Sequence, residues 1–97
     1  MMLPNNSRST VEEIAKQVDY LSILTERYVE LKTVRACKWE DMRKDEKSDA
    51  STERKWERTE EGIEQMVIKY KRQSIKEKIA TLRDWSFVLS LESRNQQ

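Results

Sequence analysis

The chain has 97 residues, enough for one domain, with 19 basic residues, 18 acidic residues and no histidine. This near balance excludes a global field that would draw the chain to nucleic acid or to a membrane surface. Charged residues make up 38% of the chain, beside one Gly and one Pro, and so few turn formers argue against an architecture of many short strands. The composition is typical of long helices and coiled coils, and we expect an all-α protein.

The first predicted element is a helix over about residues 10–46, preceded by a flexible lead at 1–8. Ser9 and Glu12 have the spacing of a capping box, in which the hydroxyl accepts from a free helical N–H and the carboxylate reaches back. The apolar residues that follow advance by three or four positions, at Val11, Ile14, Val18 and Leu21. The stripe then drifts around the helix, which indicates an irregular heptad rather than a strict zipper.

A turn is predicted at residues 47–52, the only internal cluster of small, cap-forming side chains. Ser, Asp and Thr favour caps and turns over helix interiors. No Gly or Pro enforces the break, so a single continuous helix is the alternative.

A second helix is predicted over about 53–91, followed by a polar tail at 92–97. Its apolar residues fall on two tracks. The first consists of Trp56, Ile63, Met66, Val67 and Tyr70, and the second of Ile68, Ile75, Ile79, Leu82, Trp85 and Leu89. Gly62 lies within this helix, where it either permits the close approach of a neighbour or has no such role.

The two predicted helices can be placed against each other. With a turn centred near residue 50, antiparallel pairing sets Leu31 beside Ile68, Leu24 beside Ile75, and Ile14 beside Trp85. Apolar positions then meet apolar positions along the half of the rod away from the turn. We therefore predict an antiparallel helical hairpin, similar to a coiled coil, over residues 9–91.

One seam between two helices cannot cover all of these apolar positions, and large exposed apolar patches usually mark an interface. We expect the open, terminal end of the hairpin to complete a four-helix bundle, with a second copy or with the helices of a partner subunit. The alternative is that residues 85–91 fold back as a short cap. The predicted partner-binding residues are Val11, Ile14, Val18, Tyr20, Ile23, Trp85, Phe87, Val88, Leu89 and Leu91.

The chain lacks the residues that most enzymes use. Without histidine it has neither the usual general base nor the commonest metal ligand. Cys37, the only cysteine, is interpreted as a small packing residue. No CxxC, Gly-rich phosphate loop or HExxH motif occurs, and Glu26 and Glu30 share a face without the histidine of a di-metal site. We expect no enzymatic activity, no catalytic residue, no metal and no cofactor.

The charged stretch between Trp39 and Trp56 is interpreted as a solvated tip. The two indoles are expected to close the seam below the turn by aromatic contact, and the alternative is that they anchor a partner.

A basic helical face offers a second function. Its residues are Lys69, Lys71, Arg72, Lys76 and Lys78. Side chains at steps of three and four can follow phosphates, while Tyr70 could add stacking on a base. Lysines of this kind are also common on the flanks of coiled coils, where their stems cover apolar surface.

We therefore expect a non-catalytic assembly subunit that docks through its apolar open end onto itself or onto other coiled-coil subunits. The alternative is a small helical nucleic-acid-binding or regulatory protein that uses residues 69–83. The first residues contain no apolar segment of signal-peptide length, and no run reaches the roughly 18 apolar residues of a membrane-spanning helix. A single cysteine fits a reducing compartment. We expect an intracellular protein, cytoplasmic or nuclear, with a protein partner and no membrane association.

Overall fold

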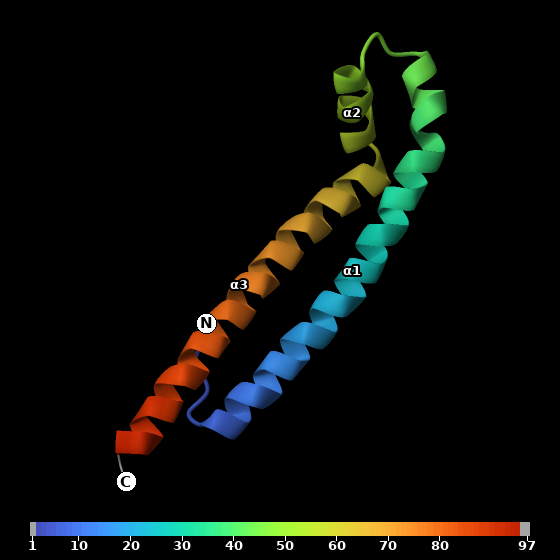
Figure 1. The fold of residues 1–97 in the computed structure, drawn as a ribbon. Helices are drawn as coiled ribbons and strands as arrows, with labels where there is room; N and C mark the ends of the chain where they lie inside the picture. The colour runs from blue at the N-terminus through green and yellow to red at the C-terminus, as the bar shows by residue number, and fades with distance from the viewer. Residues whose placement is uncertain (1, 96–97) are drawn as a thin grey trace. The chain divides into compact units, whose positions relative to one another are not determined.

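The computed structural model describes residues 2–95, which form three α-helices and no strand (Figure 1). α1 spans Ser7–Lys44, α2 spans Asp49–Glu57 and α3 spans Glu60–Asn95. The prediction of an all-helical chain is confirmed. The first four residues of the predicted polar tail belong to α3, whereas its last two residues, like Met1, lie outside the described part of the chain.

By its internal contacts the chain divides into two compact units. Unit 1 contains the described residues up to Ile23 and those from Gln73 onward, and unit 2 contains Leu24–Arg72. All of the predicted apolar partner-binding residues fall in unit 1. The predicted turn at 47–52 and the charged stretch fall in unit 2.

The cap of α1 lies one turn earlier than the predicted capping box. The Ser9 N–H donates to the side-chain oxygen of Asn6 at 2.8 Å, so Asn6 caps the helix. Asn is as effective as Ser at this position, and the prediction that Ser9 and Glu12 form the cap is wrong. Glu12 instead accepts from Arg8 at 3.3 Å. Residues 7 and 8 therefore belong to the helix and not to the lead.

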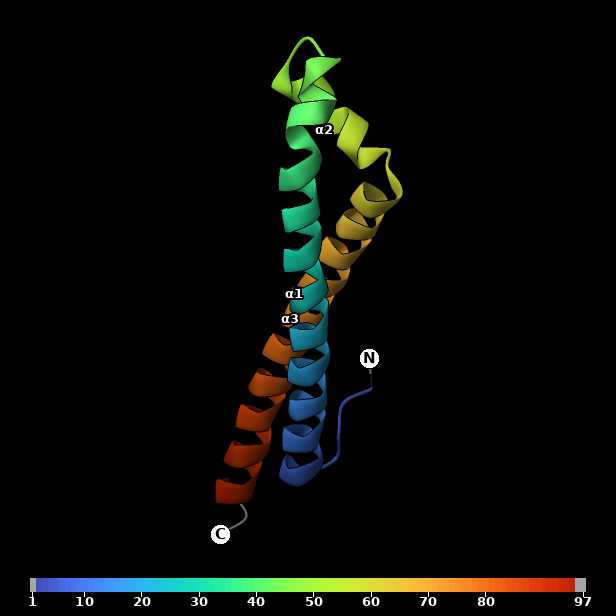
Figure 2. The ribbon, with the colours of Figure 1, turned by 90° about the vertical axis from the view of Figure 1, so that its right-hand side faces the viewer.

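The predicted break in the helix is present, but it lies at 45–48 instead of 47–52 (Figure 2). The Ser48 hydroxyl accepts from the Ser51 N–H at 3.2 Å, and the Ser51 hydroxyl accepts from the Ser48 N–H at 3.4 Å. This reciprocal pair is the capping box of α2. The small polar residues thus start a helix, and the chain is not one continuous helix.

The sequence predicts one helix over 53–91, but the structure has two helices that part around Thr59. The Thr59 hydroxyl donates to the Trp56 carbonyl oxygen at 2.6 Å and accepts from the Gly62 N–H at 3.0 Å. One side chain therefore closes α2 and caps α3. α3 then continues without a break, so residues 85–91 do not fold back as a cap.

Gly62 lies where the start of α3 touches the end of α2. A Cβ atom at this position would collide with the Trp56 carbonyl oxygen and lie 2.7 Å from its carbonyl carbon. These are backbone atoms, which cannot move aside as the end of a flexible side chain can. Gly62 therefore permits a close approach between the two helices, which is the first of the two roles that the sequence allows.

Unit 1 has a buried group on α3 and a polar tie to the residues before α1. The buried residues described in this unit are Thr10, Ile75, Ile79 and Leu82. The indole N–H of Trp85 donates to the Pro4 carbonyl oxygen at 2.6 Å. This bond holds the segment before α1 against α3 within the unit.

Unit 2 buries side chains from all three helices. They are Leu31, Met42, Thr52, Trp56 and Ile68. Lys38 donates to Glu61 at 2.9 Å, and Arg72 donates to the Thr25 hydroxyl at 3.1 Å. Because the later residue of α1 meets the earlier residue of α3, the two segments run in opposite directions inside this unit (Figure 1).

Gly62→Ala tests the close approach of α2 and α3. Alanine in a helix is normally more stable than glycine by about 1 kcal/mol, but here its Cβ has no room. We expect the free energy of unfolding to fall by about 1–3 kcal/mol, the usual cost of overpacking, as measured by urea denaturation. Ser74→Ala, at an exposed position of the same helix, is the control and should change little. A Gly62→Ala variant more stable than the parent would contradict the packing.

Candidate functional site

The structure leaves most of the predicted apolar partner-binding residues exposed. Ile14, Trp85 and Leu89 are half-buried. The seven exposed residues are Val11, Val18, Tyr20, Ile23, Phe87, Val88 and Leu91. A large exposed patch of apolar side chains usually marks an interface. We therefore ask which of these residues lie together on one helix face.

Three of these residues form one patch on α3. Leu91 follows Phe87 by four positions and Val88 by three, so it lies beside both of them on the surface of the helix. Their exposed fractions are 64%, 39% and 41%, so the interior of unit 1 does not cover them. We call this group the terminal patch.

The exposed apolar residues of α1 do not form a single face. Val11 and Val18 are seven positions apart and lie on the same side of the helix. Tyr20 follows Val11 by nine positions, or two and a half turns, and so lies on the opposite side. The predicted set therefore covers more than one face of unit 1.

A second exposed apolar group lies in unit 2, at the start of α3. Its residues are Ile63, Met66, Val67 and Tyr70, with exposed fractions of 53%, 43%, 46% and 68%. They follow the i, i+3, i+4, i+7 spacing of an amphipathic helix face. We call this group the α3 stripe; it is absent from the predicted partner-binding residues.

The α3 stripe is exposed because the other apolar track of the helix is buried. Ile68 is 6% exposed, and Leu31, its partner in the predicted register, is fully buried. The predicted register, which sets Leu31 beside Ile68, places the second track of α3 against the first helix, and both of these residues are buried in unit 2. Tyr70, the last residue of the stripe, is among the most exposed aromatic side chains described.

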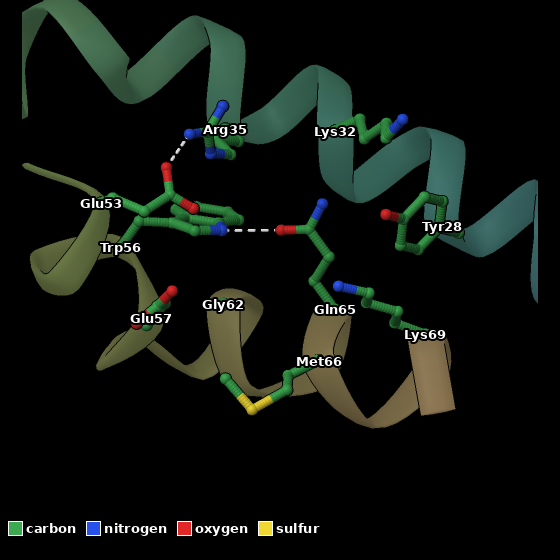
Figure 3. A pocket seen from close by; sticks show the side chains of 10 residues that line it. All are labelled: Tyr28, Lys32, Arg35, Glu53, Trp56, Glu57, Gly62, Gln65, Met66 and Lys69. Carbon is green, nitrogen blue, oxygen red and sulfur yellow. Dashed lines mark hydrogen bonds and ion pairs between the residues drawn. The ribbon is translucent and has the colours of Figure 1, made fainter. Parts of the chain in front are cut away.

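Unit 2 also contains a groove of about 530 Å³ between α1, α2 and the start of α3 (Figure 3). Its lining includes Tyr28, Lys32, Arg35, Glu53, Trp56, Gly62, Gln65 and Lys69. Tyr28 and Lys69 lie at one end, and Glu53 and Trp56 lie at the other (Figure 3).

The groove is held together by contacts among its own residues. The Trp56 indole N–H donates to the Gln65 side-chain oxygen at 2.7 Å (Figure 3). Arg35 pairs with Glu53 and lies 4.4 Å from the centroid of the Trp39 ring. The two tryptophans thus have different partners, and the predicted contact between their rings is not what holds this region.

Tyr28 is contacted by two cations. The Lys32 ammonium lies 5.0 Å from its ring centroid, and the Arg72 guanidinium lies 4.7 Å from it. Arg72 is therefore engaged inside unit 2 through both Tyr28 and Thr25. The four lysines predicted with it as nucleic-acid contacts, Lys69, Lys71, Lys76 and Lys78, are exposed.

Two groups of ion pairs connect α1 and α3 in unit 2. Hydrogen bonds to Glu64 and then to Glu30 raise the pKa of Arg27 above its ordinary value. The Lys38 hydrogen bond lowers the pKa of Glu61, with a smaller contribution from a backbone N–H. Both pairs are open to solvent, which screens them. They orient the two helix segments rather than perform chemistry.

Among residues 2–95, no three His, Cys, Asp or Glu side chains come together as a metal site. Cys37 is exposed, so the interpretation of it as a packing residue is wrong: it faces outward from α1. In the described part of the chain, every helix is too short or too polar to cross a membrane. No protein-family model, curated protein or solved structure matches this chain.

Lys38→Gln tests the Glu61 ion pair. Removing the ammonium should raise the pKa of Glu61 toward its ordinary value of 4.5, as measured by NMR titration of the side-chain carboxyl. Because the pair lowers this pKa, its stabilisation is present above the ordinary value and is lost as the pH falls through the lowered pKa. The parent and Lys38→Gln should therefore converge in stability in acid.

Lys44→Gln is the control for this titration. Lys44 pairs with Asp41 on its own helix, so its loss should leave the pKa of Glu61 unchanged. An identical Glu61 titration in the parent and in Lys38→Gln would contradict the assignment.

Proposed function

We propose that the protein is a non-catalytic assembly subunit that binds other helices through the exposed apolar residues of unit 1. The observation that carries the proposal is the set of seven large apolar side chains that this unit leaves in water. Burying such side chains against another surface is favourable, at about 25 cal/mol per Å² of apolar area. Binding to a partner would bury these residues, which remain exposed in the isolated chain.

The proposal includes an antiparallel hairpin of α1 and α3 as the binding element. Contacts in each unit support it. In unit 1, Trp85 on α3 bonds to Pro4, which precedes α1. In unit 2, Arg27 pairs with Glu64 and Lys38 pairs with Glu61. Two such hairpins, or one hairpin and two helices of a partner, would form a four-helix bundle.

The terminal patch is the best candidate for the centre of this interface. Phe87 supplies a large aromatic surface of the kind that anchors protein interfaces. Val88 and Leu91 extend the patch along the same face, as in the packing of one amphipathic helix against another. We propose that the partner surface is an apolar helix face.

The internal contacts of unit 2 favour assembly over the alternative functions. Arg72, at the middle of the predicted basic face, is already engaged with Tyr28 and Thr25. Arg35 in the groove is likewise paired with Glu53. One of the five predicted phosphate contacts is thus engaged within the fold, while the four lysines are exposed. We propose assembly because it gives the exposed apolar residues a role, and nucleic acid would not.

Replacing the terminal patch with charge tests the proposal. We expect the double variant Phe87→Asp with Leu91→Asp to lose binding by about tenfold or more, because buried, unpaired carboxylates are strongly disfavoured at an interface. Light scattering over a concentration series would report self-association. Affinity capture with quantitative mass spectrometry would report partners that the parent retains.

Ser74→Asp is the control, since it adds one carboxylate of the same kind at an exposed polar position of α3. It should bind as the parent does, and circular dichroism should show equal helix content in all three proteins. A parent that is monomeric at every concentration, and that retains no protein lost by the double variant, would contradict the proposal.

A further inference from the structure

The α3 stripe is an apolar face with no covering segment from its own unit. Ile63, Met66, Val67 and Tyr70 are each more than two-fifths exposed. The track formed by Ile68 already supplies the helix with its buried side. Apart from Met66, which also lines the groove, the stripe faces away from the interior of unit 2. Its spacing is that of a helix that packs on another helix.

The charges along this part of α3 are segregated. Its first turns carry Glu60, Glu61 and Glu64 with no basic residue between them, and residues 69–72 carry Lys69, Lys71 and Arg72 with no acidic residue. Glu61 and Glu64 are paired with α1, and Arg72 is engaged with Tyr28 and Thr25. The exposed Glu60 at one end of the stripe and the exposed Lys69 and Lys71 at the other are therefore the charges that a second copy can meet. A surface of this kind is complementary to itself when it is reversed.

We infer that the α3 stripe binds a second copy of the chain, with the two α3 helices antiparallel about a two-fold axis. The centre of the stripe falls between Met66 and Val67. In this arrangement Met66 of each copy meets Val67 of the other, and Ile63 meets Tyr70. A two-fold interface uses the same patch on both copies, so each apolar residue of the stripe gains an apolar neighbour.

Charge complementarity fixes the direction of the second copy. Glu60 and Lys71 lie on the same flank of the stripe, since they are 11 positions, or about three turns, apart. Antiparallel pairing brings Glu60 of one copy close to Lys71 of the other, and does so twice. Parallel pairing about a two-fold axis would instead place the Glu60 and Lys71 residues of the two copies on opposite sides of the interface, so both Glu60–Lys71 contacts would be lost.

A standard interface buries about 800 Å² on each partner, and four side chains cover a smaller area. We therefore expect a weak dimer that depends on protein concentration. Because ion pairs at its rim are exposed, the association should also weaken as salt is added. This surface lies in unit 2, whereas the proposed function uses unit 1, and the two can be tested separately.

The Phe87→Asp, Leu91→Asp background removes any association through the terminal patch. Sedimentation equilibrium in this background then measures association through the α3 stripe. In this background we expect a monomer–dimer equilibrium. Adding Val67→Asp should raise the dissociation constant by about tenfold or more, since it places like carboxylates at the two-fold axis. Adding Ser74→Asp should leave the constant unchanged. A monomer at all concentrations, or a dimer that Val67→Asp does not affect, would overturn the inference.

A charge exchange then tests the direction of packing in the same background. Glu60→Lys and Lys71→Glu should each weaken the homodimer. An equal mixture of the two should associate as the parent does, because each antiparallel contact again joins opposite charges. A mixture that associates no better than its components, or far better than the parent, would overturn the antiparallel arrangement.

Discussion

An α-helix can turn only one face toward a given neighbour, and α3 carries two apolar tracks. In unit 2 the track of Ile68 is buried, so Ile63, Met66, Val67 and Tyr70 remain in water. The rotation of the helix is fixed where α3 starts. There the Trp56 carbonyl lies against Gly62, and the Trp56 indole bonds to Gln65. The exposed stripe is therefore a consequence of how α2 and α3 meet.

Polar and apolar side chains are distributed differently in the two units, and this distribution supports the proposed role in assembly. Polar contacts such as Arg35 with Glu53 and Arg72 with Tyr28 connect helices within unit 2. Large apolar side chains, by contrast, point outward in both units. These charged contacts connect helices within unit 2, and the exposed apolar residues are the surface that we propose partners bind.

Periodicity and composition were sufficient to predict an all-helical chain and the approximate position of the first break, but not α2 as a separate helix. They could not locate the caps, because Asn6 and Ser9 are equally good candidates and only the backbone decides between them. The break at Thr59 depends on one hydroxyl that serves two helix ends, and a single threonine among charged residues is a weak signal. The predicted apolar residues of unit 1 were chosen from their density. The α3 stripe was left out, although the predicted register already placed the Ile68 track, and not the stripe, against the first helix.

The rotation of α3 is tested most directly by the accessibility of two neighbouring residues. In a Cys37→Ser background, Val67→Cys places a thiol at an exposed position of α3, and Ile68→Cys places one at the neighbouring buried position. At a protein concentration low enough to keep the chain monomeric, the rate of thiol modification measures exposure of each position. We predict fast modification for Val67→Cys and slow modification for Ile68→Cys. Equal rates, or the reverse order, would contradict the account.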